Sequence, residues 1–217
     1  MVEKSVEKSD ITSNNEISKT VEDKQPIDDN EKYETRELVE YKPKPISLKV
    51  AILAIFTALG VALSALFIYL PHVELLSLTL FLGGIVLGLL YGSFLAILSA
   101  LLYEIIASAM IGTGFIIFPF KMIAFLIIVI TGAIFVKKIP KNPKFFWRFF
   151  FGVIGGLLTI FYDLIVNVGW ILFSEVGYFT AIITGLPITA SRVATNTVLF
   201  LFIPDIYNRG IKPLLPN

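Results

Sequence analysis

The sequence contains no cysteine and only one histidine, His72. The first absence excludes disulfides, thiolate catalysis and any zinc or iron–sulfur site with cysteine ligands. The second leaves too few imidazoles for a histidine-rich metal site. The chain also lacks HExxH, GxSxG and Walker motifs, which carry the chemistry of zinc proteases, serine hydrolases and nucleotide-binding proteins. We therefore expect neither an enzyme nor an ATP-binding site, and no metal or cofactor.

Charged residues become scarce after residue 45. Residues 1–45 hold 12 of the 17 acidic side chains and 8 of the 18 basic ones, although the formal net charge of the whole chain is only +1. Large apolar side chains are few in this segment, so burial could not offset the entropy lost on ordering it. We predict a disordered, charged cytoplasmic tail over residues 1–45.

Long apolar runs fill the rest of the chain. Hydrophobic residues make up 56% of the sequence, above the roughly 45–50% of soluble domains. About 20 apolar residues in a helix cross a hydrocarbon core of about 30 Å, and a helix satisfies its own backbone groups there. We predict an all-α membrane protein with about six transmembrane helices in a compact bundle over residues 46–205, followed by a short cytoplasmic tail over 206–217.

Proline and glycine mark the ends of the expected spans. The first span is predicted from Ile46 to Leu70, immediately before Pro71. The apolar stretch over 75–111 is too long for one crossing, so we place a tight turn near Tyr91 and Gly92. The later spans are predicted over 119–137, 148–173 and 179–203, with Pro119 in the first turn of the fourth.

Basic residues at the span ends predict the orientation. Segments 71–74, 112–118 and 173–180 contain no lysine or arginine. With six spans, every basic end falls on one side, and positive residues are retained in the cytoplasm. We therefore expect a multi-pass plasma-membrane protein with both termini in the cytoplasm. The basic residues concerned are Lys42, Lys44, Lys49, Lys137, Lys138, Lys141, Lys144, Arg148, Arg209 and Lys212.

Four ionisable residues lie deep within the predicted spans. Such residues cost roughly 2.5–3.5 kcal/mol each on insertion scales, and they usually face a cavity or one another. Two acids and two bases balance in charge, so they could form structural pairs that lock helices together. They could equally line a hydrophilic pocket. These residues are Glu104, Lys121, Asp163 and Arg192.

The neighbours of two of these residues favour a pocket. Asp163 and Asn167 are four residues apart, as are Arg192 and Asn196, so each pair shares one helix face. Polar faces on consecutive spans can frame a hydrophilic site. We therefore expect these four residues to contact a small-molecule substrate.

Further candidates for substrate contact lie close to these spans. Tyr162 and Trp170 add aromatic surface beside the polar face of the fifth span, although Trp170 is also typical of a membrane interface. His72 and Glu74 lie on the outer connection after the first span, where their polarity could also be that of an ordinary solvated loop.

Small residues recur along one side of the first span. Ala54, Ala58 and Ala62 follow one another at steps of four. A stripe of small residues lets another helix approach closely. The approaching helix could belong to the same bundle or to a partner protein.

Four segments, in order, carry a family resemblance. They are Ala54-Ile-Phe-Thr-Ala58, Pro71-His-Val-Glu-Leu75, Gly83-Gly-Ile-Val-Leu-Gly-Leu-Leu-Tyr-Gly92 and Tyr162-Asp-Leu-Ile-Val-Asn167. Over residues 46–205 the chain resembles the substrate-binding S component of energy-coupling factor (ECF) transporters. The resemblance implies a six-helix subunit that captures a vitamin-like small molecule from outside. A separate transmembrane coupling protein and two cytoplasmic ATPases would drive uptake, with no role for nucleic acid.

The resemblance also assigns residues. The AxxxA motif that contacts the coupling protein in the family falls on Ala54 and Ala58. The family's pocket lies in the outer half of the bundle among the later helices. That position directs attention to Glu104, Lys121, Asp163, Asn167 and Arg192.

Two other classes of protein fit the same features. A self-sufficient secondary transporter or a small channel would use the intramembrane charges as an ion or proton relay. A membrane scaffold without a ligand would show all four charges tied into pairs, with no cavity beside them.

Overall fold

The computed structural model describes residues 45–67, 69, 75–112, 115–173 and 177–214. The chain divides into two units, residues 1–43 and 44–217, and the helices described below belong to the second unit. All regular structure in the described ranges is helical, as predicted. The predicted acidic tail, Pro71, His72 and Glu74 lie outside the described residues.

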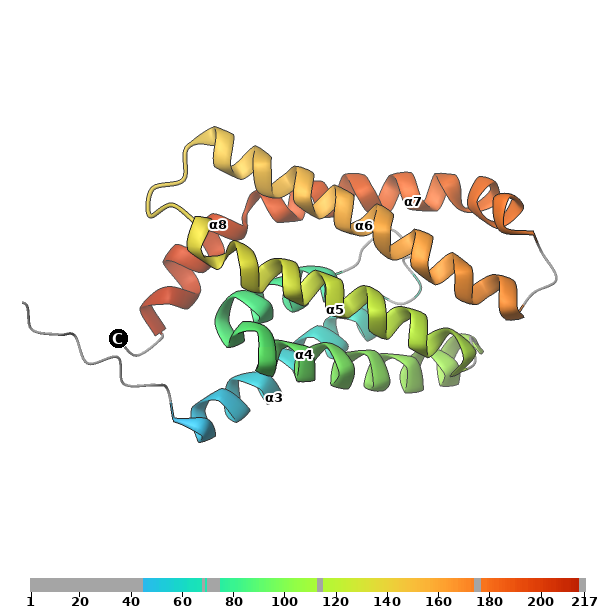
Figure 1. Cartoon of the computed structure of the whole chain (residues 1–217), viewed down its shortest axis with the longest axis horizontal. Coiled ribbons are helices and arrows are strands. Elements are labelled where there is room, and N and C mark those ends of the chain that lie inside the picture. Colours follow the sequence, from blue (N-terminus) through green and yellow to red (C-terminus); the bar gives the residue numbers. More distant parts are fainter. Residues whose placement is uncertain (1–44, 68, 70–74, 113–114, 174–176, 215–217) are drawn as a thin grey trace, which may run out of the picture. The chain divides into compact units, whose positions relative to one another are not determined.

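Five long helices form the membrane-spanning unit (Figure 1). Each is long and apolar enough to cross a membrane. The protein is therefore a multi-pass membrane protein. The helices are α3 (Ile46–Leu66), α4 (Leu75–Ile111), α5 (Phe118–Phe135), α6 (Phe145–Phe173) and α7 (Tyr178–Leu201).

Short helical turns adjoin the long helices. They are η1 (Phe115–Ile117), η2 (Val136–Lys138), α8 (Ile203–Asp205), the π-helix η3 (Ile206–Ile211) and η4 (Lys212–Leu214). Pro119 lies in the first turn of α5, as predicted, where its missing N–H costs no hydrogen bond.

Helix α4 is broken at Gly88. This residue has φ 73° and ψ −170°, a conformation open almost only to glycine. The two parts of α4 fold back on each other, since a Cβ added at Gly92 would lie 3.5 Å from the Cα of Gly84. Figure 1 shows this reversal in the green ribbon. The turn predicted at Tyr91 and Gly92 was therefore misplaced, because both residues are helical.

The break also explains the number of spans. Residues 75–87 would extend only about 20 Å at 1.5 Å per residue, less than the hydrocarbon core of about 30 Å. The unit therefore has six apolar helical legs, close to the predicted count, but the second leg is short. Counted as one element, α4 gives five helices that are long enough to cross.

The short leg over residues 75–87 forms part of the core. Leu80 and Phe81 on this leg are fully buried. The Phe81 ring contacts two other rings edge-on, with centroid distances of 6.2 Å to Phe151 of α6 and 5.1 Å to Phe200 of α7. Aromatic pairs favour this geometry, and the contacts join the first part of the bundle to the last.

Glycines allow the short leg to approach α5 very closely. A Cβ added at Gly84 would lie 2.3 Å from the carbonyl oxygen of Val129 on α5. A Cβ added at Gly132 of α5 would lie 2.3 Å from the carbonyl oxygen of Phe81. Backbone therefore packs directly on backbone here, which no larger residue permits.

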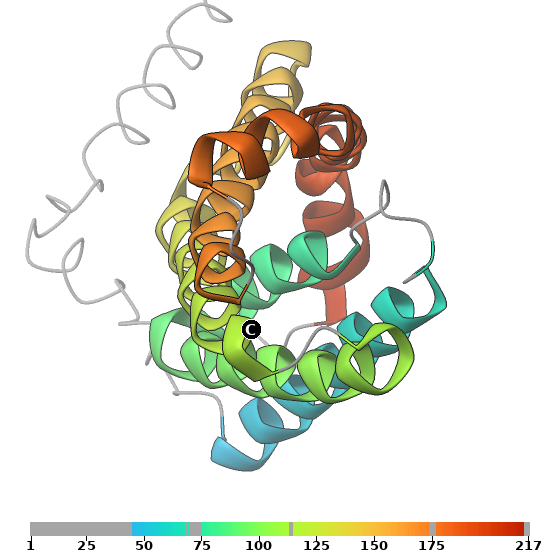
Figure 2. The same cartoon turned by 90° about the vertical axis from the view of Figure 1, so that its right-hand side faces the viewer.

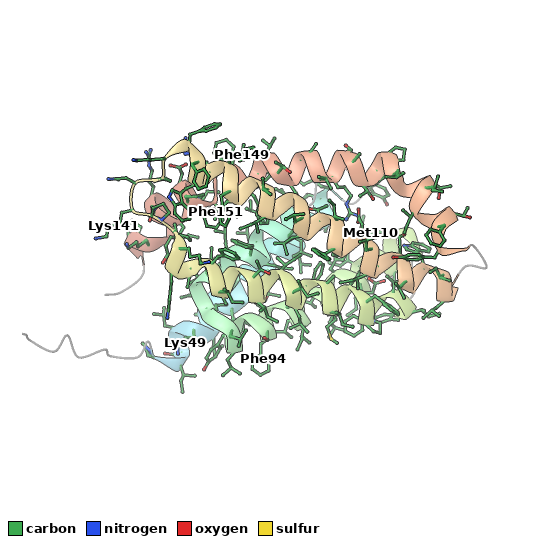
Figure 3. The ribbon with its side chains drawn as sticks, turned by 45° about the horizontal axis from the view of Figure 1, so that its top comes forward. Lys49, Phe94, Met110, Lys141, Phe149 and Phe151 are labelled. Carbon is green, nitrogen blue, oxygen red and sulfur yellow. The ribbon has the colours of Figure 1, made fainter. Side chains whose placement is uncertain are left out.

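Several connections gather at one end of the bundle. The Lys49 ammonium near the start of α3 lies 5.2 Å from the centroid of the Tyr91 ring, just after the break in α4. Asn208 of η3 donates a 2.8 Å hydrogen bond to the carbonyl oxygen of Pro140, in the connection between α5 and α6. Figure 3 shows Lys49 toward this end and Met110 toward the opposite one. The basic ends of the helices thus lie together, as the charge pattern predicted.

Candidate functional site

An ion pair joins α4 to α5 inside the bundle. Lys121 Nζ donates a 2.6 Å hydrogen bond to Glu104 Oε2, and the two side chains are 9% and 0% exposed, respectively. The same ammonium lies 5.0 Å from the centroid of the Tyr103 ring. Glu104 and Lys121, both predicted as site residues, are therefore brought together.

A second ion pair joins α6 to α7, which lie side by side in the bundle (Figures 1 and 2). Arg192 Nη1 donates a 2.6 Å hydrogen bond to Asp163 Oδ1. The Arg192 side chain is 20% exposed and the Asp163 side chain 9%. The guanidinium also lies 5.2 Å from the centroid of the Tyr162 ring. The structure thus unites three of the predicted residues.

Two stacked rings lie between the ion pairs. Phe125 and Tyr162 are nearly parallel, with centroids 5.5 Å apart and an interplanar angle of 15°. Phe125 follows Lys121 by one helical turn on α5, and Tyr162 is next to Asp163 on α6. Contacts therefore join α4 to α5, α5 to α6 and α6 to α7 in turn. We call this set of residues the polar layer; its members are Tyr103, Glu104, Lys121, Phe125, Tyr162, Asp163 and Arg192.

A cavity of about 340 Å³ lies between α6 and α7, beside the second ion pair. Asp163 forms part of its wall with only 8% of its surface exposed. The second carboxylate oxygen, Oδ2, is buried and has no hydrogen-bond partner among the described residues. The cavity is lined by Ile160, Asp163, Leu164, Asn167, Ile182, Leu186, Thr189, Ala190 and Val193.

A proline lies within the stretch of α7 that lines this cavity. Pro187 follows Leu186 and precedes Thr189 in the wall. It removes one backbone N–H from the helical ladder in this part of α7. Asn167, one of the predicted site residues, lines the cavity, whereas the sequence gave no reason to select Thr189.

Asn196, which was predicted to contact the substrate, lies outside the cavity and bonds to α6. It is 1% exposed, lies outside the cavity wall, and donates a 2.8 Å hydrogen bond from Nδ2 to Thr159 Oγ1. Thr159 in turn donates to the carbonyl oxygen of Gly155. Asn196 therefore holds α7 against α6, because its position one turn beyond Arg192 brings it opposite Thr159.

Two other groups of predicted residues lie away from the cavity. Trp170 is not among the lining residues and is 36% exposed. Ala54, Ala58 and Ala62 are exposed on α3. Helix α3 instead packs on α4 through Thr57, Gly60, Val61 and Ser64, so the alanine stripe plays no part in this packing.

The arrangement is suited to hydrogen bonding with a bound molecule. Each buried carboxylate of the polar layer has a cation at 2.6 Å, so the layer carries no net charge. In the described ranges, no three His, Cys, Asp or Glu side chains gather as metal ligands would. A cavity of this size, largely apolar and with a few convergent polar groups, is typical of a small-molecule site.

The cavity also distinguishes a ligand-binding protein from a membrane scaffold that has no ligand. A scaffold without a ligand would have paired charges and no cavity, whereas this bundle has both paired charges and a cavity at Asp163.

No protein family, curated protein or solved structure matches the chain.

Proposed function

We propose that this protein is the membrane-embedded substrate-binding subunit of an ECF-type importer, and that it binds a vitamin-like small molecule in the plasma membrane. The observation that carries the proposal is the cavity between α6 and α7, with the buried Asp163 carboxylate in its wall. A charged group buried in a membrane protein is costly, and such groups mark substrate pathways and binding sites.

The exposed alanine stripe on α3 supports a partner helix. Ala54, Ala58 and Ala62 form a smooth face that the rest of the described chain leaves open. Small residues of this kind allow close helix packing in the membrane. In the proposal, this face contacts the transmembrane coupling protein, and two cytoplasmic ATPases supply the energy that this chain has no motif to obtain.

The gathered basic ends support the orientation. Because lysine and arginine are retained in the cytoplasm, we assign this end of the bundle, and with it both termini, to the cytoplasmic side. The substrate would then be captured in the outer half of the membrane. Coupling to the ATPases would occur at the basic end.

A proton or ion relay through the polar layer has less support. Each intramembrane carboxylate lies 2.6 Å from a cation of a neighbouring helix. A relay would have to break a buried ion pair in every cycle, and removing one partner of such a pair costs about 3–5 kcal/mol.

The decisive experiment is affinity purification from native membranes, followed by identification of the associated proteins. The native chain should retain two ATPases and one multi-span membrane protein in fixed proportion. Ala54→Leu/Ala58→Leu should lose them, because two added side chains prevent close helix contact. Ala194→Leu, a matched change of an exposed alanine on α7, should keep them. Equal recovery from all three chains, or no ATPase with any of them, would overturn the proposal.

A further inference from the structure

The cavity between α6 and α7 opens on the outside of the bundle. Four of its lining residues are themselves surface residues, including Ile160 at 40% exposure and Leu186 at 52%. Leu164 and Ala190 are exposed as well. All four are apolar and lie on membrane-spanning helices. The mouth of the cavity therefore faces the hydrocarbon of the bilayer.

The position of Asp163 along α6 agrees with this. It lies about 27 Å from the start of the helix at Phe145 and about 15 Å from its end at Phe173, at 1.5 Å per residue. The carboxylate is therefore well inside the apolar span. A molecule that reaches the cavity through its mouth arrives from lipid, without crossing the aqueous face of the bundle.

The wall defines the chemistry of such a molecule. Arg192 balances the charge of Asp163 at Oδ1, while Oδ2 has no hydrogen-bond partner in the described part of the chain. An uncharged hydrogen-bond donor would bind the Asp163 carboxylate without adding a charge. Asn167 and Thr189 are the other polar lining residues, and the remaining six are apolar.

The volume sets the size of the ligand. At about 30 Å³ for each water-sized group, a cavity of about 340 Å³ holds about a dozen non-hydrogen atoms. This is the size of a small amphiphile, with one polar group and a short apolar body.

We propose that the substrate of this site is a lipid-soluble amphiphile with an uncharged hydrogen-bond donor, which enters between α6 and α7 from the bilayer and donates to the Asp163 carboxylate in the cavity wall. This inference rests on the proposed function only in taking the cavity as the substrate site. It adds the class of substrate and the direction from which it arrives.

Two isomeric probes test the inference. 1-Undecanol and decyl methyl ether have the same formula and twelve non-hydrogen atoms each, but only the alcohol donates a hydrogen bond. The full chain in lipid nanodiscs is titrated with each probe, and the apparent affinity per mole fraction in the bilayer is taken from the shift in the unfolding midpoint. Because only the alcohol can donate a hydrogen bond to the charged carboxylate, it should bind at least about tenfold more tightly than the ether.

Matched variants locate the effect. Ala190→Phe and Leu186→Trp fill the cavity from its wall while leaving both residues of the ion pair unchanged, and each should abolish the difference between the probes. Ala194→Phe places the same ring one turn away, outside the wall, and should preserve it. Using two filling variants keeps the test valid if one of them does not fold.

Each other outcome overturns the inference. Equal affinity for alcohol and ether would mean that the cavity accepts any apolar chain, as a phospholipid tail would supply. A change of oligomeric state with Ala190→Phe, without discrimination between the probes, would mean that a helix of a second copy fills the groove. Retention of the ATPases is measured separately, so failure of this inference and failure of the proposed importer function are distinguishable.

Discussion

Arg192 Nη1 on α7 lies 2.6 Å from Asp163 Oδ1 on α6, and this contact joins two helices that are consecutive in the chain. The aspartate belongs both to this pair and to the wall of the cavity. In our proposal, the same side chain therefore both stabilises the bundle and binds the ligand. Stability and binding must be measured separately at this position.

The Asp163–Arg192 pair should show strong coupling. Asp163→Leu leaves the arginine without this carboxylate inside the bundle, which should lower the free energy of unfolding by about 3–5 kcal/mol. Asp163→Leu/Arg192→Met should recover most of the loss, because an apolar pair replaces the ionic one. Unfolding in mixed detergent micelles is measured for the native chain, the two single variants and the double variant, which together form a double-mutant cycle. A single variant as stable as the native chain would contradict the pairing.

The Glu104–Lys121 pair should tolerate reversal of both of its charges but not reversal of only one. Lys121→Glu places two carboxylates where a buried ion pair now lies. It should abolish recovery of monodisperse protein, since two like charges cannot both remain ionised there. Glu104→Lys/Lys121→Glu restores opposite charges and should restore recovery in gel filtration. If the double variant is no better than either single one, the two side chains do not act as a pair.

Glycine substitutions should distinguish close packing from backbone conformation. Gly132→Ala puts a methyl group against the Phe81 carbonyl oxygen and should cost about 1–3 kcal/mol. Gly88→Ala meets open space but has a positive φ, so it should also cost about 1–3 kcal/mol through strain. Gly185→Ala meets nothing within 4 Å in a helix and should be neutral or slightly stabilising. Thermal unfolding measures all three, and an unchanged midpoint for Gly132→Ala would contradict the α4–α5 contact.

The Asn196–Thr159 hydrogen bond should be specific to the hydroxyl. Thr159→Val removes the acceptor of the buried Asn196 amide and should cost about 1–3 kcal/mol. Thr159→Ser keeps the hydroxyl and should cost less. Ligand affinity should change little in either variant, because neither residue lines the cavity. If Thr159→Val loses more free energy of ligand binding than free energy of unfolding, Asn196 contributes to the binding site.

Much of the fold could be predicted because its causes are local in the sequence. Apolar length and terminal prolines determined the positions of α5, α6 and α7 to within a few residues. The turn in α4 was harder to place, since Gly84, Gly88 and Gly92 recur at equal steps and each could have been the break. Only tertiary contacts distinguish the three glycines. Gly84 and Gly92 pack closely against neighbouring atoms, whereas a Cβ added at Gly88 would have no atom within 4 Å.

The site was predictable where charge was the signal. A charged side chain in a membrane span needs a partner, which is why Asp163 and Arg192 could be selected together. Phe125 and Tyr103 carry no such signal, because the chain contains 19 phenylalanines and 8 tyrosines and most of them lie in apolar spans. Helix periodicity also could not show that Asn196 meets Thr159 instead of the cavity, since that depends on the rotation of α7 against α6.

The central claim is that the cavity at Asp163 holds a small-molecule substrate. The most direct test is mass spectrometry of small molecules released from the chain purified from its native membranes, compared with Asn167→Leu in the wall. Thr195→Val, which loses only a hydrogen bond to Ser191 within α7, is the matched control. We predict one compound, near one per chain, in the native protein and the control, and its loss from Asn167→Leu. The same compounds in equal amounts from all three chains would contradict the claim.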